Sequence, residues 1–219
     1  MITVFDYDGN LHKTDAIYGY AVRRALRELP FQVPEDKLKA SDEELSCYLG
    51  VNAADMWKDF YPGLHEKDVS AIIKKVGLYM REGISLGRSR LYKGAKEVLD
   101  TLQQRGHTLV ILSNCTISYM DAQRSAHRLD RWFSGYYCSE AYGNAPKEEI
   151  FYEIKKDFPG EYVRSGDRKS DIFAAACHGI KSVGCAYGYG GPGELEEADC
   201  VIEDIRDITG KITAGHLSL

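Results

Sequence analysis

The stretch Met1-Ile-Thr-Val-Phe-Asp6-Tyr-Asp8-Gly9-Asn10-Leu11-His12 decides how the rest of this chain is arranged. A short apolar run is followed at once by two carboxylates and a glycine. A continuous apolar run that ends in turn residues is typical of a buried parallel strand. In an open α/β sheet, the carboxyl end of such a strand borders the ligand site. We therefore expect Asp6 and Asp8 to project into a crevice, with Gly9 allowing a sharp turn beneath them.

The two carboxylates in this stretch, Asp6 and Asp8, have no basic residue beside them, so bringing them together is unfavourable unless a cation lies between them. Carboxylate oxygens are hard ligands of the kind that Mg²⁺ prefers. An Asp-x-Asp-Gly sequence also occurs in ordinary turns and in calcium-type loops. The prediction of a Mg²⁺ site therefore depends on the rest of the chain.

The composition is that of an ordinary globular protein. The chain has 219 residues, of which 44% are hydrophobic and 28% charged, enough for one large domain or a domain with a smaller insertion. The formal net charge of −5 provides no basic field for nucleic acid or for anionic lipid. We expect neither as a partner, and we find no segment typical of a signal peptide or membrane anchor.

The six cysteines include no Cys-x-x-Cys pair and no zinc-like spacing. Several lie within apparent strands or helices, where free cysteine behaves as a small apolar residue. This usage indicates reduced thiols rather than a disulfide framework, and hence a cytoplasmic protein.

The pattern of elements changes near residue 91. Residues 13–90 show helical periodicity and no convincing strand. From residue 91 onward, short apolar strands alternate with helices, which predicts right-handed crossovers and a parallel sheet covered on both faces. The first strand must join this sheet, because a lone strand is not stable. The expected strands are 2–5, 109–112, 136–138, a strand from 162, 182–186 and 200–202.

We therefore predict an α/β protein in two parts. Residues 1–12 and 91–219 form a Rossmann-like parallel sheet core that is the catalytic domain. Residues 13–90 form an α-helical cap domain inserted after the first strand.

Three further polar features fall just past expected strand ends or at a helix start. They are Ser113-Asn114, Lys147, and Asp167 with Asp171. Because the carboxyl ends of parallel strands share one edge of the sheet, residues far apart in the sequence can converge there. A hydroxyl, a lysine and two pairs of acids together suit the transfer of a phosphoryl group to a carboxylate.

A phosphate monoester is anionic and repels a carboxylate nucleophile, so Asp6 can attack only if charge is neutralised. Mg²⁺ held by Asp6, a main-chain carbonyl near Asp8 and Asp167 would supply most of that neutralisation. Attack would give an aspartyl-phosphate. Asp8 would protonate the departing alcohol and then deprotonate the water that hydrolyses the intermediate.

The phosphoryl oxygens need donors of their own. Lys147 and the Ser113 hydroxyl would bind these oxygens, whose charge is redistributed in the transition state. Backbone amides in the Gly9 turn and after Ser113, at Asn114, would add further donors to the substrate.

Four segments, in order, resemble the motifs of the haloacid dehalogenase (HAD) superfamily. They are Phe5-Asp-Tyr-Asp-Gly-Asn-Leu11, Leu112-Ser-Asn114, Lys147 and Ser165-Gly-Asp-Arg-Lys-Ser-Asp171. The nearest branch is the phosphoglycolate phosphatase-like one, which carries a helical cap between the first and second motifs. The Tyr187-Gly-Tyr-Gly loop resembles that branch too.

The resemblance implies a HAD-like core and a role for each motif residue. Asp6 would be the nucleophile and Asp8 the acid/base, and Ser113 and Lys147 would bind phosphate. Asp6, Asp8 and Asp167 would hold Mg²⁺, and Asp171 would support the metal site or its water shell.

The chain departs from the branch at two of these motifs. Asn10 stands where threonine is usual. Lys147 lacks the flanking Lys-Pro-x-Pro pattern. No role is assigned to His12.

The predicted function is a Mg²⁺-dependent phosphatase acting on a small phosphorylated metabolite, either phosphoglycolate-like or a sugar phosphate. A phosphomutase of the β-phosphoglucomutase type stays open, as do a phospho-aspartate-switched binding protein and a catalytically idle one. A true dehalogenase is disfavoured, because that reaction needs neither a metal nor an acid at Asp8. The sequence does not decide between monomer and dimer. It also does not say which cap cation reaches a substrate carboxylate, among candidates that include Arg23, Arg24, Lys39, Lys58 and Arg81.

Overall fold

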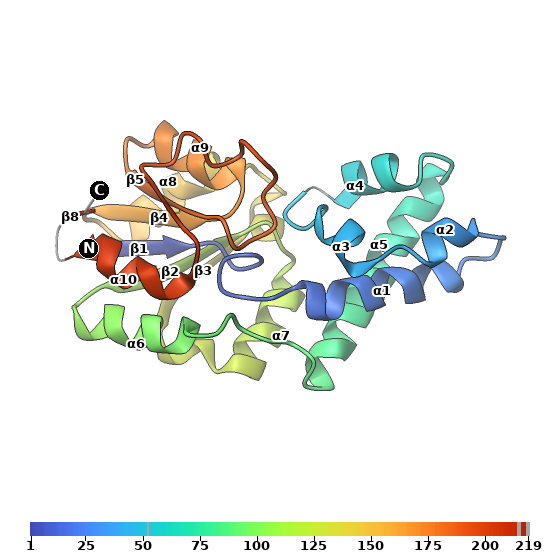
Figure 1. Ribbon diagram of the computed structural model, residues 1–219, viewed down its shortest axis with the longest axis horizontal. Coiled ribbons are helices and arrows are strands. Elements are labelled where there is room, and N and C mark those ends of the chain that lie inside the picture. The colour runs from blue at the N-terminus through green and yellow to red at the C-terminus, as the bar shows by residue number, and fades with distance from the viewer. Residues whose placement is uncertain (52, 214–215, 218–219) are drawn as a thin grey trace. The chain divides into compact units, whose positions relative to one another are not determined.

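The computed structural model describes residues 1–51, 53–213 and 216–217. The chain forms two compact units, which Figure 1 shows with their helices and strands labelled. The core unit comprises residues 1–13 and 91–219, and the helical unit comprises residues 14–90.

The core unit is built on a six-stranded sheet in the order β3-β2-β1-β4-β5-β6, and every neighbouring pair of strands is parallel. This result confirms the predicted parallel α/β architecture. In the register of the sheet, Phe5 lies opposite Ile111 on one side and Ser165 on the other. The carboxyl ends of the three central strands are therefore level with one another. The strands are β1 (Ile2–Phe5), β2 (Thr108–Ser113), β3 (Phe133–Cys138), β4 (Tyr162–Gly166), β5 (Lys181–Cys185) and β6 (Cys200–Ile202).

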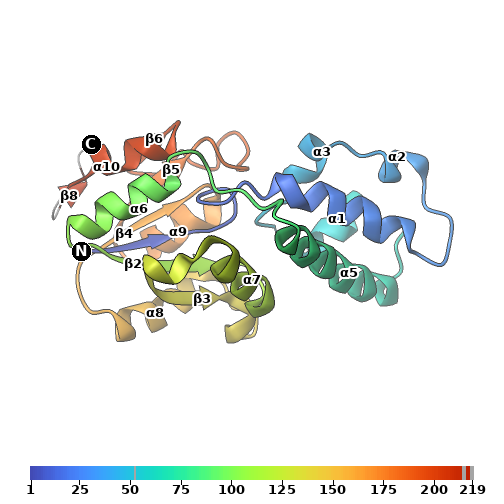
Figure 2. The same cartoon turned by 90° about the horizontal axis from the view of Figure 1, so that it is seen from below.

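Helices cover both faces of this sheet, as Figures 1 and 2 show. Helices α6 (Ala95–Gln104) and α7 (Ile117–His127) lie on one face, and α8 (Lys147–Asp157) and α9 (Lys169–Cys177) lie on the other. The apolar side of α8 packs on β1, β2 and β3 through a buried cluster that includes Ile150, Phe151, Val4, Val110 and Tyr137. A short α10 (Ile208–Lys211) follows β6.

Two elements begin three residues earlier than the sequence pattern indicates. β3 starts at Phe133 rather than at residue 136, because the exposed Ser134 and the following glycine interrupt its apolar run. α9 starts at Lys169 rather than at residue 172, because its first turn is polar and the apolar periodicity begins only after that turn.

All regular structure within residues 14–51 and 53–90 is helical. The apolar sides of the helices enclose one buried cluster that includes Val22, Leu26, Trp57 and Ile72. Ser41 caps α3 (Asp42–Ser46), since its hydroxyl accepts the Glu44 N–H at 3.0 Å. The helices are α1 (Asp15–Arg27), α2 (Glu35–Leu38), α3 (Asp42–Ser46), α4 (Ala53–Phe60) and α5 (Glu66–Ser85).

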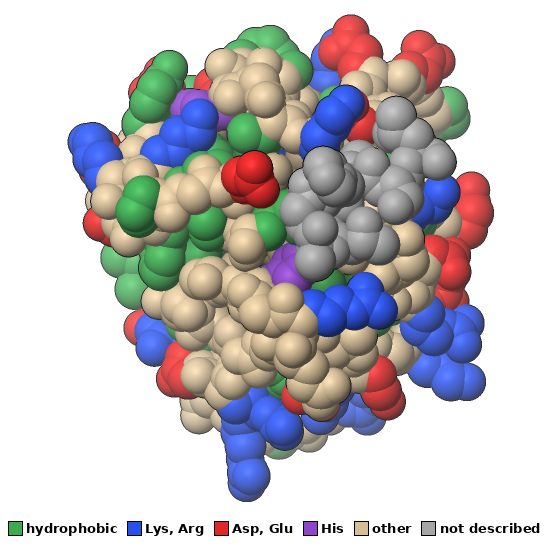
Figure 3. All heavy atoms as spheres, turned by 90° about the vertical axis from the view of Figure 1, so that its left-hand side faces the viewer, with side chains coloured by type: hydrophobic (Ala, Val, Ile, Leu, Met, Phe, Trp, Pro, Cys, Tyr) green, Lys and Arg blue, Asp and Glu red, His purple; other side chains and the backbone are tan. Residues whose placement is uncertain are grey.

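The charged side chains of the surface are mixed in sign on the face shown in Figure 3. Lys and Arg side chains there are interspersed with Asp and Glu rather than gathered into one basic area. Among the helices of the described residues, none has both the length and the apolar content needed to span a bilayer.

Candidate active site

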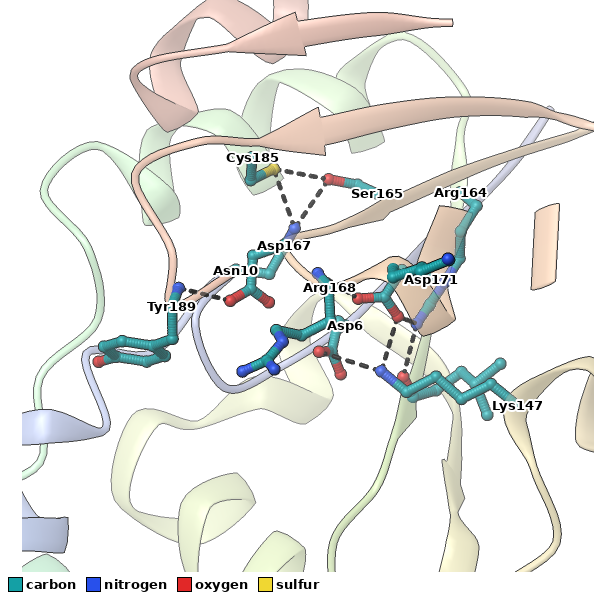
Figure 4. Close-up of polar contacts among 12 residues, drawn as sticks. Asp6, Asn10, Lys147, Arg164, Ser165, Asp167, Arg168, Asp171, Cys185 and Tyr189 are labelled. Carbon is teal, nitrogen blue, oxygen red and sulfur yellow. Dashed lines mark hydrogen bonds and ion pairs between the residues drawn. The ribbon is translucent and has the colours of Figure 1, made fainter. Parts of the chain in front are cut away.

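The predicted functional residues lie at the carboxyl edge of the central strands. Asp6 directly follows β1, Ser113 ends β2, and Asp167 directly follows β4. Lys147 is the first residue of α8 and Asp171 lies in the first turn of α9. Figure 4 shows how Asp6, Lys147 and Asp171 approach one another.

Three buried carboxylates form the centre of the site. Asp6, Asp167 and Asp171 each offer an oxygen, and these oxygens all lie within 4.8 Å of one another. Asp6 Oδ1 and Asp167 Oδ1 are both buried and have no hydrogen-bond partner. Burying ionised oxygens without partners is costly. These oxygens therefore suit a hard divalent cation such as Mg²⁺.

Two buried cations lie against this cluster. Lys147 Nζ is 3.1 Å from Asp6 Oδ2 and 2.6 Å from Asp171 Oδ1. Arg164, in β4, also donates to Asp171 Oδ1, and its Nη2 is 3.0 Å from the Leu112 carbonyl oxygen. Arg164 is fully buried and was not among the predicted site residues. An arginine in the middle of a strand expected to be buried was the available signal, because such a charge needs a partner.

The pKa values of the two carboxylates that carry the unpartnered oxygens, Asp6 and Asp167, are raised. Burial raises the pKa of Asp6 to about 6, although Lys147 opposes the shift. Burial, reinforced by the negative charges of Asp6 and Asp171, raises the pKa of Asp167 well above its usual range. Both shifts reflect charge that has been removed from water and only partly compensated.

In the ion pair behind them, the pKa shifts of both partners favour the charged forms. Burial acts to raise the pKa of Asp171, but Lys147 and Arg164 outweigh it, so the pKa is lowered. Burial acts to lower the pKa of Lys147, but Asp171 and Asp6 outweigh it, so the pKa is raised. Lys147 and Asp171 are therefore held as a charged pair.

Asp167 is enclosed by glycines. A Cβ atom at Gly9 would lie 2.1 Å from Asp167 Oδ2, and one at Gly188 would lie 2.2 Å from its Cβ. A Cβ at Gly190 would lie 2.0 Å from the Asp167 carbonyl oxygen. The Tyr189 N–H donates to Asp167 Oδ2 at 2.7 Å. The first turn and the loop after β5 therefore fix Asp167 from two sides, and no larger residue fits at these points.

The Asp8 carboxylate contacts Tyr119 and His12. Its Oδ1 accepts the Tyr119 hydroxyl at 2.6 Å and lies 3.1 Å from His12 Nδ1. Its side chain is 17% exposed, in contrast to the buried cluster. Neither His12 nor Tyr119 was a predicted site residue, and Tyr119 lies 111 residues away from Asp8 in the sequence.

The remaining predicted residues surround the site. Gly9 has a φ of +83°, a left-handed conformation that favours glycine, and its N–H donates to the His12 carbonyl oxygen at 3.0 Å. Ser113 is buried and Asn114, which follows it in the turn after β2, is exposed. Because Phe5 is level with Ile111, Asp6 and Ser113 lie at adjacent strand ends.

Asn10, which stands where the family pattern has threonine, joins three strands. Its Nδ2 donates to Ser165 Oγ at 2.9 Å and to Cys185 Sγ at 3.1 Å. The Tyr187 hydroxyl donates to the Asn10 carbonyl oxygen at 3.0 Å. Asn10 therefore links the end of β1 to β4 and β5.

Four of the five candidate cations of the helical unit have acidic partners within that unit. These ion pairs are Arg23–Asp42, Arg24–Glu82, Lys39–Glu35 and Lys58–Asp55. Their pairing therefore does not single out one of them for a substrate carboxylate.

Residues 3–185 match the family described as haloacid dehalogenase-like hydrolase. A phosphoglycolate phosphatase from Haemophilus influenzae (strain 86-028NP) is 28% identical over 197 residues, covering 84% of this chain and 85% of its own length. A 5'-nucleotidase from Pseudomonas aeruginosa is 27% identical over 201 residues, covering 88% and 85%. The crystal structure of a predicted phosphoglycolate phosphatase from Haemophilus somnus 129pt shares the fold, with a TM-score of 0.80, 24% identity and coverage of 94% and 95%. The match over most of the core and the motif order together confirm the resemblance: this chain belongs to the haloacid dehalogenase-like hydrolase family.

Proposed function

We propose that this protein is a Mg²⁺-dependent phosphatase that hydrolyses a small phosphate monoester through an aspartyl-phosphate at Asp6. The observation that carries the proposal is the buried cluster of Asp6, Asp167 and Asp171, in which Lys147 contacts two of the three carboxylates. Such a site combines a nucleophile, ligands for a cation and a fixed positive charge.

Asp6 and Asp167, with a main-chain carbonyl near Asp8, would hold Mg²⁺, and Asp171 would support them through its ion pairs. The unpartnered buried oxygens of Asp6 and Asp167 support this assignment. When bound, Mg²⁺ would neutralise charge on the phosphoryl group, which otherwise repels the Asp6 carboxylate.

The chain's own residues would carry out two displacements. In the first, an Asp6 oxygen bonds to phosphorus, the bond from phosphorus to the leaving oxygen breaks, and Asp8 gives that oxygen a proton. In the second, Asp8 takes a proton from water, the water oxygen bonds to phosphorus, and the Asp6 carboxylate is released. Lys147 and Ser113 would hold the phosphoryl oxygens throughout.

The Gly9 turn and Asn114 remain proposed contributors of backbone donors to the substrate. Gly9 also lets Asp167 approach the first turn, as its steric surroundings indicate. The helical unit would act as a cap that excludes bulk water and selects the substrate.

A small phosphorylated metabolite, phosphoglycolate-like or a sugar phosphate, is the proposed partner, with neither nucleic acid nor membrane involved. The names of the curated relatives, phosphoglycolate phosphatase and 5'-nucleotidase, support the substrate class. The proposed location is the cytoplasm, supported by six cysteines that are all free thiols.

The test is phosphate release from p-nitrophenyl phosphate with and without Mg²⁺. Turnover should require Mg²⁺, stop on addition of EDTA and vanish in Asp6→Asn. Asp121→Asn is the matched control, because it makes the same chemical change at an exposed residue of α7. Activity that survives either EDTA or Asp6→Asn would refute the mechanism.

A screen of phosphorylated metabolites with the purified chain would then identify the substrate. Release of inorganic phosphate supports the phosphatase. Transfer of the phosphoryl group between two positions of a sugar, with activation by a bisphosphate, would instead show a phosphomutase.

A further inference from the structure

A buried hydrogen-bond network of the core unit ends on one oxygen of Asp8. The Tyr119 hydroxyl donates to Asp8 Oδ1 at 2.6 Å. His12 Nδ1 lies 3.1 Å from the same oxygen and 3.2 Å from the Tyr119 hydroxyl. His12 is fully buried and Tyr119 nearly so. Two side chains from separate segments thus converge on Oδ1.

The contacts behind His12 fix which of its ring nitrogens carries hydrogen. The Tyr7 hydroxyl donates to Gln123 Oε1 at 3.1 Å, so the Gln123 amide nitrogen faces His12 Nε2, at 3.4 Å. An amide nitrogen can only donate, and His12 Nε2 therefore accepts. In the neutral ring, the hydrogen then lies on Nδ1 and points to Asp8 Oδ1.

The same surroundings keep the donors in place. The Tyr7 ring stacks on the His12 ring at 5.3 Å between centroids, with 10° between their planes. The Tyr119 hydroxyl directs its one hydrogen to Asp8 Oδ1, because an ionised carboxylate oxygen can only accept. Oδ1 therefore faces two donors in the resting protein.

Resting on the proposed function, we propose that Tyr119 and His12 are positioning residues that orient Asp8 by donating to Oδ1, so that Oδ2 exchanges the proton with the substrate. An oxygen that faces two donors has no room for a proton of its own, because the donor hydrogens would clash with it. A general acid is effective only when its proton is held toward the leaving oxygen. The network thus serves proton transfer and not phosphate binding.

The test compares two aryl phosphates that differ in their need for a proton. The p-nitrophenolate leaving group departs as a stable anion, whereas the more basic phenolate of phenyl phosphate benefits from protonation. Rapid mixing measures the first turnover, in which the phenol or phenolate is released, separately from the later hydrolysis step. In Tyr119→Phe, this rate should fall about tenfold or more with phenyl phosphate but by less than about twofold with p-nitrophenyl phosphate.

Two further variants separate positioning from general damage. His12→Asn can still present an N–H near the position of Nδ1 and should keep the wild-type ratio of the two rates, whereas His12→Leu should lose it. Tyr162→Phe is the control, since it removes a hydroxyl that donates to the Phe158 carbonyl oxygen, near the start of β4. That change should leave the ratio unaltered.

An equal fall with both substrates, or no fall with either, overturns the inference for Tyr119. Neither result affects the proposed function, which fails if phosphatase activity survives EDTA or Asp6→Asn. Unfolding midpoints of all four variants are measured alongside. If Tyr119→Phe is unfolded, the ratio in His12→Leu compared with His12→Asn decides the question alone.

Discussion

Lys147 and Asp171 form a buried ion pair, with 2.6 Å between Nζ and Oδ1, although they belong to different helices. Each is at most 2% exposed. Asp171 also pairs with Arg164, and Lys147 also contacts Asp6. Asp171 is therefore the anion that lets two cations remain buried behind the reacting carboxylate.

Asp171→Asn should destabilise the protein strongly. The substitution leaves Arg164 without its carboxylate and Lys147 with only Asp6, and removing one partner of a buried ion pair costs about 3–5 kcal/mol. Denaturant unfolding in EDTA measures this change. The control Asp121→Asn breaks an exposed pair with Arg124 and should change the free energy of unfolding by less than about 1 kcal/mol. Equal losses in the two variants would contradict the role given to Asp171.

Sequence reasoning located the parts of the site that follow from strand ends. Apolar runs that stop at polar residues identified Asp6, Ser113 and Asp167, since the chain direction alone decides which end of a parallel strand they occupy. The parallel sheet itself followed from alternating strands and helices. The start of β3 did not, because its apolar pattern is interrupted after Phe133.

The residues that sequence reasoning missed act through contacts between distant segments. Tyr119 contacts Asp8, and Gln123 contacts His12, and in each pair the two residues are 111 positions apart in the sequence. Nothing in the local pattern of α7 indicates which of its side chains faces the site. Arg164 is a different case, because a charged residue within a buried strand indicates a partner but not its identity.

The pKa of Asp6 predicts an unusual pH dependence of stability without metal. The folded-state pKa of about 6 lies above the unfolded value of about 3.9. Asp6 therefore contributes stability that is fully present below pH 4 and is lost as pH rises through 6. The shift of about two pH units corresponds to about 3 kcal/mol.

This loss is measured as the difference in unfolding free energy between the wild-type protein and Asp6→Asn, in EDTA from pH 4 to 7. The comparison removes the contributions of the carboxylates that lie away from Asp6, which titrate alike in the two proteins. The variant should become the more stable of the two near pH 7, and Mg²⁺ should restore the wild type. A difference that stays constant with pH would show that the pKa of Asp6 is not raised.

Asn10→Ala should destabilise the protein while leaving the carboxylates of the site unchanged. The side chain donates to Ser165 and Cys185, and a buried hydrogen bond contributes about 0.5–1.5 kcal/mol, so the loss of both costs about 1–3 kcal/mol. Thermal unfolding checks this expectation. Asn114→Ala, at an exposed turn position, is the control and should shift stability by no more than about 0.5 kcal/mol. If the two variants unfold together, Asn10 does not hold β1 to β4 and β5.

Gly188→Ala should weaken Mg²⁺ binding, although residue 188 offers the cation no side-chain ligand. Its new Cβ would lie 2.2 Å from the Cβ of Asp167, closer than two such atoms approach, so Asp167 must move. Groups that orient a metal ligand typically change affinity by about 10–100-fold when altered. Titration calorimetry with MgCl₂ should give a dissociation constant raised at least about tenfold, with the unfolding midpoint recorded for each protein. Gly210→Ala, an exposed position of α10 where a Cβ meets nothing within 4 Å, should bind Mg²⁺ like the wild type. Unchanged affinity in a folded Gly188→Ala would mean that the loop after β5 does not fix Asp167 for the metal.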